Sequence, residues 1–146
     1  MSGAHILVVD DHGPLRQALE GLLRAEGYRV TVAADGLEGL GVLDRLVPDL
    51  IIADIMMPRM DGLAFLAAVR ARADGPTIPF IFLTARADDT AVTGGAAGPA
   101  PATLRKPFAP DELLALVRAR LAHGRWSDAP AAEEREGAQA GEGSRA

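Results

Sequence analysis

Short runs of apolar residues alternate along the chain with stretches in which apolar residues recur every three or four positions. The runs His5 to Asp10, Asp49 to Asp54 and Ile78 to Ala85 are almost continuously apolar, which is typical of strands buried in a parallel sheet. Apolar and polar residues alternate from Tyr28 to Ala34, and Ala102 to Arg105 is a candidate for a short fifth strand.

Helix-period stretches separate these strands. The residues expected to begin or cap the four clearest helices are Pro14, Asp35, Asp61 or Gly62, and Pro110. The first of these helices should end near Gly27, and the second should cover Leu37 to Leu46. Strands that alternate with helices predict an α/β fold, a doubly wound parallel sheet of five strands with helices on both faces.

One domain, residues 4–123, accounts for this pattern. The chain has 146 residues and is 49% hydrophobic, which is enough for a single globular core. From Gly124 the sequence is rich in Gly, Ala and Glu, so residues 124–146 are predicted to form a disordered C-terminal tail.

Charge and composition narrow the function classes. The formal net charge is −5 and no basic block is present, which argues against direct nucleic-acid binding. The absence of cysteine excludes disulfides, thiol nucleophiles and cysteine zinc sites. No apolar run is long enough for membrane insertion, so a soluble cytoplasmic protein is expected.

Polar residues follow the predicted strands at the edge of the sheet where chemistry gathers in parallel α/β folds. These residues are Asp10, Asp11, Asp54, Thr84 and Lys106. Three converging carboxylates repel one another and are costly to remove from water. A hard divalent cation removes this cost, and Mg²⁺ suits a small site of oxygen ligands.

Such a site favours phosphoryl chemistry. A carboxylate beside Mg²⁺ can attack a phosphoryl group and form an aspartyl-phosphate. The transferred group spreads negative charge over its oxygens, which positive groups and hydrogen-bond donors must stabilise. Lys106, the only lysine in the chain, offers a compact cation on a flexible stem, and the Thr84 hydroxyl can donate a hydrogen bond.

The segments "LVVDD", "IIADIMMPRMDG", "FLTA" and "LRKPF", in this order and spacing, resemble the receiver domain of two-component response regulators. The resemblance implies a flavodoxin-like sheet in the order 2-1-3-4-5, with Asp54 as the phosphoacceptor. It also implies Mg²⁺ ligands, namely Asp10 through water, Asp11, Asp54 and the backbone carbonyl of Met56. Thr84 would be the switch hydroxyl and Lys106 the phosphoryl-binding lysine, followed by a cis bond to Pro107.

Two features depart from the family pattern. Thr103 occupies a position, three residues before the lysine, where receivers usually have an aromatic residue. The segment Ala87 to Thr103 is rich in Gly and Pro where receivers have their fourth helix, so that helix is predicted to be weakened or missing.

The function expected from these observations is a stand-alone receiver that is not an enzyme in its own right. It would take a phosphoryl group on Asp54 from a histidine kinase or phosphotransfer protein, or from a small acyl phosphate, and signal through protein contacts. Three alternatives stay open. They are a constitutive receiver-fold interaction module, a Mg²⁺-dependent phosphohydrolase, and a flavodoxin-like cofactor binder. His12 disfavours a phosphohydrolase of the haloacid dehalogenase type, which needs a second aspartate there.

Overall fold

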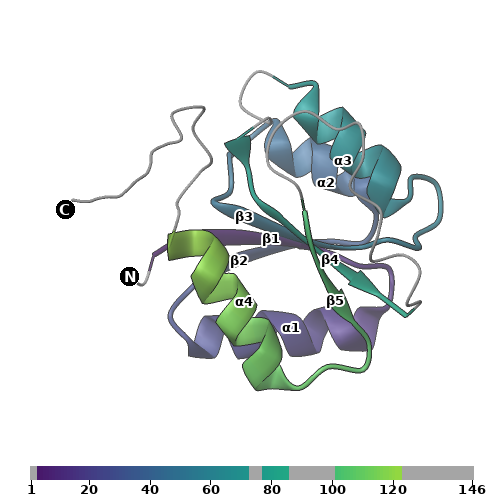
Figure 1. The fold of residues 1–146 in the computed structure, drawn as a ribbon. Helices are drawn as coiled ribbons and strands as arrows, with labels where there is room; N and C mark the ends of the chain where they lie inside the picture. Colours follow the sequence, from purple (N-terminus) through teal and green to yellow (C-terminus); the bar gives the residue numbers. More distant parts are fainter. Residues whose placement is uncertain (1–2, 73–76, 86–100, 123–146) are drawn as a thin grey trace.

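The computed structural model describes residues 3–72, 77–85 and 101–122. Five parallel strands form one sheet in the order β2-β1-β3-β4-β5 (Figure 1). The strands are β1 (His5–Val9), β2 (Arg29–Ala33), β3 (Leu50–Asp54), β4 (Phe80–Thr84) and β5 (Ala102–Arg105). The predicted doubly wound α/β fold and its strand order are confirmed.

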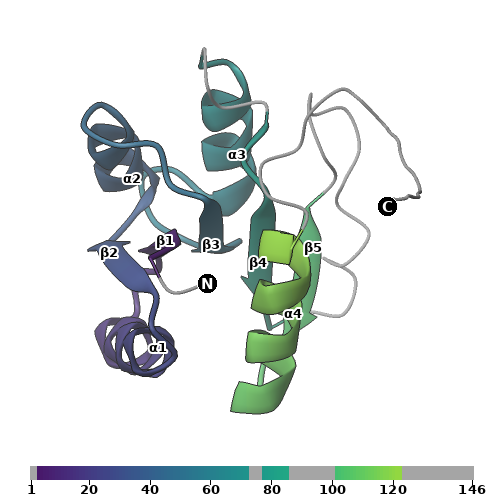
Figure 2. The ribbon, with the colours of Figure 1, turned by 90° about the vertical axis from the view of Figure 1, so that its left-hand side faces the viewer.

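Helices cover both faces of the sheet, two on each within the described residues. The helices are α1 (Gly13–Ala25), α2 (Gly36–Leu43), α3 (Gly62–Arg70) and α4 (Pro110–Ala122). Figures 1 and 2 show α2 and α3 together on one face and α1 and α4 on the other. Parallel strands need crossover connections, and helices in those connections cover the faces of the sheet, which gives this three-layer arrangement.

The core is divided by the sheet into two apolar clusters, and β1 contributes to both. Leu7 and Val9 pack in the cluster beneath α2 and α3, whereas Ile6 and Val8 pack in the cluster beneath α1 and α4. All four side chains are fully buried. Successive side chains point to opposite faces of a strand, and because both faces are covered here, the run is continuously apolar.

The predicted second helix is shorter than its sequence pattern suggests. Asp35 caps it as predicted, but α2 ends at Leu43 and Asp44 is its C-cap, so the helix does not reach Leu46. Leu46 and Val47 still pack against the core. The apolar pattern therefore continues beyond the helix because burial, rather than helical structure, maintains it.

Two predictions fall on parts of the chain outside the described residues. They are the weakened or missing helix between Ala87 and Thr103, of which residues 87–100 are not described, and the tail 124–146. In the described ranges, no helix is long and apolar enough to cross a membrane.

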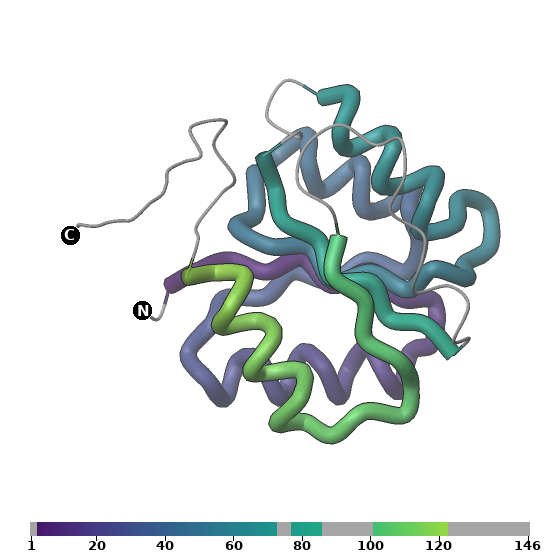
Figure 3. The backbone as a smooth tube through the Cα atoms, viewed as in Figure 1, coloured from purple at the N-terminus to yellow at the C-terminus, as the bar shows by residue number. Residues whose placement is uncertain are grey.

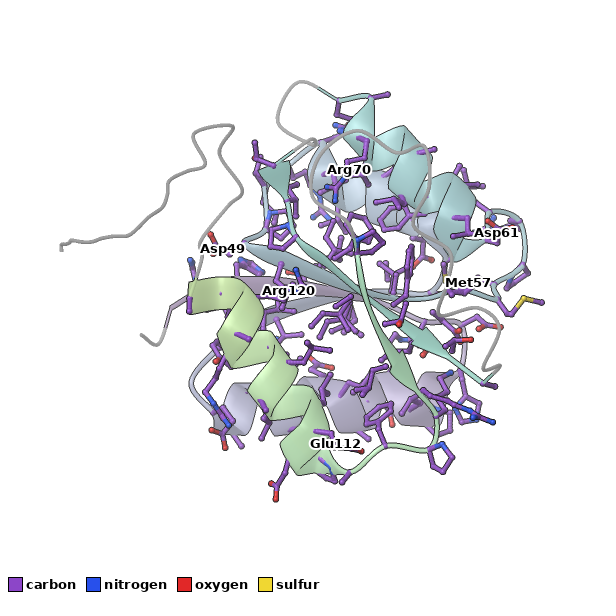
Figure 4. All side chains as sticks on the ribbon, in the orientation of Figure 1. Asp49, Met57, Asp61, Arg70, Glu112 and Arg120 are labelled. Carbon is purple, nitrogen blue, oxygen red and sulfur yellow. The ribbon has the colours of Figure 1, made fainter. Side chains whose placement is uncertain are left out.

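The carboxyl ends of β1, β3 and β4 all lie on one side of the molecule, at the right in Figure 3. Figure 4 labels Met57 and Asp61 in the β3–α3 loop at this end, and Asp49, just before β3, at the opposite end. Parallel strands thus bring the residues that follow them to one edge.

Candidate functional site

Strand register places the predicted site residues on neighbouring strands. Val9 pairs with Ala53, so Asp10 and Asp54 follow at the same level of β1 and β3. Asp54 pairs with Leu83, which immediately precedes Thr84. Lys106 directly follows β5, and its backbone N–H donates to the Thr84 carbonyl oxygen at 2.7 Å.

Three carboxylates converge at this edge. One carboxylate oxygen from each of Asp10, Asp11 and Asp54 lies within 4.8 Å of the other two. Asp10 is fully buried and Asp54 is nearly so, whereas Asp11 is exposed. The cluster combines hard oxygen donors with one side open to solvent, an arrangement suited to Mg²⁺ with retained waters.

Asp10 has one satisfied and one unsatisfied carboxylate oxygen. Its Oδ1 accepts a hydrogen bond from the His12 backbone N–H at 2.9 Å. Its Oδ2 is buried and has no hydrogen-bond partner within the part of the chain that the structure describes. Burial raises the pKa of Asp10, the His12 hydrogen bond opposes this rise, and the charge of Asp54 adds to it. A buried anionic oxygen without a donor is costly, and a bound cation would remove that cost.

Lys106 contacts the acidic cluster directly. Its Nζ donates to Asp54 Oδ2 at 2.9 Å and lies 3.9 Å from Asp10 Oδ2. The Lys106 side chain is 24% exposed, so this contact is more strongly attractive than a surface ion pair. The Lys106–Pro107 peptide bond is cis, as the family resemblance implied.

The remaining residues singled out in the sequence are Thr84, Met56 and Thr103, which lie in or close to β4, β3 and β5. Thr84 is 1% exposed at the end of β4. The Met56 backbone N–H donates to Asp54 Oδ1 at 3.2 Å, and its side chain is largely exposed. That the Met56 carbonyl oxygen binds a cation stays a prediction. Thr103 is half-buried in β5, paired with Phe82.

Glycine at position 62 allows α3 to begin directly against the end of β3. A Cβ added to Gly62 would lie 2.4 Å from the Asp54 carbonyl oxygen and 2.8 Å from the Ile55 Cα. The Gly62 N–H donates to the Ile55 carbonyl oxygen at 2.7 Å, and Asp61 caps the helix. The close approach requires a residue without a side chain.

Two arginines contribute contacts that sequence reasoning missed. Arg16 donates from Nη1 to the Asp10 backbone carbonyl oxygen at 2.8 Å. Arg59, in the loop after β3, forms an ion pair with Asp35, for which only helix capping was predicted. Surface arginines are common, so their type and spacing carry no signal that could have identified these contacts.

Known proteins resemble this chain over most of its length. The DNA-binding response regulator MtrA of Mycobacterium tuberculosis is 40% identical over 116 residues, which are 80% of this chain and 50% of MtrA. The chain spans about half the length of the curated relatives it matches.

One sequence prediction is wrong. The acidic composition led us to expect no direct nucleic-acid binding, whereas MtrA is a DNA-binding response regulator. Half of MtrA has no counterpart in the matched residues. The net charge of a receiver describes only its own surface, so it does not exclude nucleic acid as a partner of a response regulator.

Solved structures and a family model also match this chain over most of its length. The chemotaxis response regulator CheY4 of Vibrio cholerae has a TM-score of 0.72 and 34% identity, covering 82% of this chain and 100% of CheY4. The receiver domain of the sensor histidine kinase PA1611 from Pseudomonas aeruginosa, solved with a magnesium ion coordinated in its active site cleft, has a TM-score of 0.70 and 31% identity, covering 83% of this chain and 99% of that domain. The family model for the response regulator receiver domain matches residues 6–118. The chain therefore belongs to the response regulator receiver domain family.

Proposed function

We propose that this receiver domain accepts a phosphoryl group on Asp54 in a Mg²⁺-dependent reaction and transmits the change through macromolecular contacts. The observation that carries the proposal is the convergence of Asp10, Asp11 and Asp54 with Lys106, whose Nζ lies 2.9 Å from Asp54 Oδ2. Receiver domains are signalling modules rather than classical enzymes, so the reaction serves to switch the protein.

The residues present fit a divalent cation. The supporting observation is that the buried Asp10 Oδ2 has no hydrogen-bond donor among the described residues, while Asp10 offers a carboxylate oxygen within 4.8 Å of one from Asp11 and one from Asp54. Asp10 through water, Asp11, Asp54 and the Met56 carbonyl oxygen are proposed to hold the ion. When bound, Mg²⁺ would neutralise negative charge on the phosphoryl oxygens.

Asp54 and Lys106 have distinct roles in the proposed transfer. An Asp54 carboxylate oxygen forms the new bond to phosphorus while the bond from phosphorus to the donor's nitrogen or oxygen breaks, and the leaving group keeps the electron pair. Lys106 Nζ then moves its hydrogen bond from Asp54 Oδ2 to a phosphoryl oxygen. The Thr84 hydroxyl is proposed to donate to another phosphoryl oxygen, which would draw β4 toward the site.

The proposed phosphoryl donor is a histidine kinase or phosphotransfer protein, and small acyl phosphates should substitute in the test tube. A cytoplasmic location and a receiver unit spanning residues 4–123 belong to the same proposal. The family-model match over residues 6–118 supports these bounds.

The test is intact-mass spectrometry after incubation with acetyl phosphate and Mg²⁺. We expect one added phosphoryl group, which is absent from Asp54→Asn and absent when a chelator is present. A folded, Mg²⁺-binding protein that gains no phosphoryl group from acetyl phosphate or a kinase would contradict the proposal. That result would favour the constitutive interaction module, for which Thr103 in place of an aromatic residue is the supporting observation.

A further inference from the structure

The loop between β3 and α3 contains a residue in an unfavourable backbone conformation. Arg59 has φ of +66°, in the left-handed region that residues with a side chain seldom adopt. The loop comprises residues 55–61 and directly follows Asp54, the last residue of β3. Because the backbone of Arg59 is disfavoured, contacts made by neighbouring side chains must hold it.

An ion pair provides the first of these contacts. Arg59 Nε donates to Asp35 Oδ2 at 2.9 Å, and Nη2 makes a second, shorter contact with the same oxygen. Asp35 Oδ1 accepts a hydrogen bond from the Glu38 backbone N–H at 2.9 Å. One carboxylate oxygen therefore caps α2, and the other pairs with Arg59. Asp35 is 5% exposed and fixed at the start of α2, which makes it a rigid anchor for the loop.

Close packing provides the second contact. A Cβ added to Gly36 would lie 2.8 Å from Met60 Cγ, so the Met60 side chain lies directly on the first residue of α2. Arg59 and Met60 thus attach the middle of the β3–α3 loop to the start of α2. The beginning of the same loop is attached to the phosphoacceptor, because the Met56 N–H donates to Asp54 Oδ1.

We propose that Arg59 is a positioning residue for the cation site, acting through its ion pair with Asp35. The pair fixes the β3–α3 loop three residues after Met56, and so fixes where the Met56 carbonyl oxygen lies relative to the carboxylates. The inference rests on the proposed function, in which that carbonyl binds Mg²⁺. Arg59 and Asp35 would act on the site without binding the cation or the phosphoryl group themselves.

A second Arg–Asp pair offers a matched control. Arg72, just after α3, donates to Asp44 at the end of α2 with an Nη2–Oδ1 distance of 2.6 Å. This pair joins the C-terminal ends of α2 and α3, away from the carboxylates, whereas the Arg59–Asp35 pair joins the β3–α3 loop to the start of α2. It resembles the Arg59–Asp35 pair in chemistry and differs in location.

The experiment compares the whole chain with Arg59→Gly, Asp35→Asn, their double variant and the controls Arg72→Gly and Asp44→Asn. Glycine accepts the left-handed backbone without strain, and asparagine keeps a side-chain oxygen to cap α2. Binding of Mg²⁺ alone is measured by titration calorimetry, and phosphoryl uptake from acetyl phosphate is measured across Mg²⁺ concentrations.

We expect the Kd for Mg²⁺ to rise about tenfold in each of the two site variants, as for loss of a residue that orients a metal ligand. The double variant should be no weaker than the weaker single variant, because both remove one interaction. Uptake should recover at high Mg²⁺. The controls should keep the wild-type Kd.

An unchanged Kd in folded Arg59→Gly and Asp35→Asn would overturn the inference, as would an equal rise in Arg72→Gly. If Arg59→Gly does not fold, Arg59→Lys decides, since it keeps one donor and should have an intermediate Kd. Wild-type protein that binds no Mg²⁺ would overturn the proposed function and this inference together. Wild-type binding with unaffected site variants would overturn only the role of Arg59.

Discussion

At the scale of single residues, the position of Lys106 explains why one lysine occurs in a chain otherwise supplied with arginine. The Lys106 ammonium reaches Asp54 Oδ2 at 2.9 Å inside a partly buried cluster of acids. A compact charge on a flexible stem can shift its hydrogen bond from a carboxylate oxygen to a phosphoryl oxygen more readily than a rigid guanidinium fork can.

Replacing Lys106 should therefore slow phosphoryl uptake without unfolding the domain. We expect Lys106→Ala to reduce the uptake rate from acetyl phosphate about 100-fold, as for other lost charge-stabilising donors. Lys106→Arg should not restore it. The rate is measured by intact mass against time, with the exposed neighbour variant Arg105→Ala as the control. Wild-type rates in Lys106→Ala would contradict the assigned role.

Asp10→Asn should show separately how the Asp10 charge affects folding stability and how it affects Mg²⁺ binding. The substitution removes a buried charge whose Oδ2 accepts no hydrogen bond from any described residue, so without divalent cations the variant should be more stable than wild type by about 1–3 kcal/mol. Mg²⁺ should stabilise the wild type and have little effect on the variant, because a ligand stabilises only the state that binds it. Urea unfolding with Mg²⁺ or with chelator measures both effects. Equal stabilisation of the two proteins by Mg²⁺ would show that Asp10 is not part of the cation site.

At the scale of elements, the start of α2 depends on the charge of Asp35. The Glu38 backbone N–H holds the pKa of Asp35 below its usual value of 3.8, and Arg59 lowers it further. A carboxylate with a lowered folded-state pKa stabilises the protein above its unfolded pKa, and this contribution is lost as the pH falls through the folded value.

Two variants of Asp35 should differ in their effect on stability. Asp35→Ala removes both the cap and the ion pair and should cost about 0.5–2 kcal/mol at pH 7. Asp35→Asn keeps the cap and should cost less, and its difference from wild type should shrink as the pH falls below 3.8. Unfolding free energies from urea titrations between pH 7 and pH 3 test this. A difference that widens toward low pH would contradict the assigned charge interaction.

The contact between α3 and β3 leads to another prediction. Gly62→Ala places a methyl group 2.4 Å from the Asp54 carbonyl oxygen, so the helix must move and the variant should lose about 1–3 kcal/mol. The phosphoryl uptake rate should fall too, since the shifted backbone carries Asp54, the proposed acceptor. Gly41→Ala in α2, where an added Cβ meets nothing within 4 Å, should be neutral or stabilising by up to about 1 kcal/mol. Thermal unfolding of both variants measures their stability. A Gly62→Ala variant more stable than Gly41→Ala would contradict this account.

At the scale of the whole molecule, the fold could be predicted because the three central strands, β1, β3 and β4, are buried on both faces. Continuous apolar runs, such as the one from Ile6 to Val9, and polar residues at their ends then define both the layers and the functional edge. The acids, Thr84 and Lys106 lie near that edge because parallel strands all end there. The order of the strands came from family resemblance, since apolar pattern does not determine which strands are neighbours.

Other features depend on tertiary contacts that local sequence does not specify. The end of α2 was misplaced because Leu46 is packed against the core after the helix has ended. The Arg59–Asp35 pair joins residues 24 positions apart, and neither residue type indicates in the sequence that the two will form an ion pair. The pairing follows only when β2 and β3 are placed on either side of β1.

The central claim, that Asp54 accepts the phosphoryl group, is tested most directly by locating the new bond. Treating the phosphorylated protein with borohydride reduces an aspartyl-phosphate to homoserine, which peptide mass spectrometry then places in the sequence. We predict homoserine at position 54, dependent on Mg²⁺ and acetyl phosphate, with aspartate retained at positions 10 and 11. Homoserine at position 10 or 11, or an adduct on another residue type with Asp54 unchanged, would contradict the account.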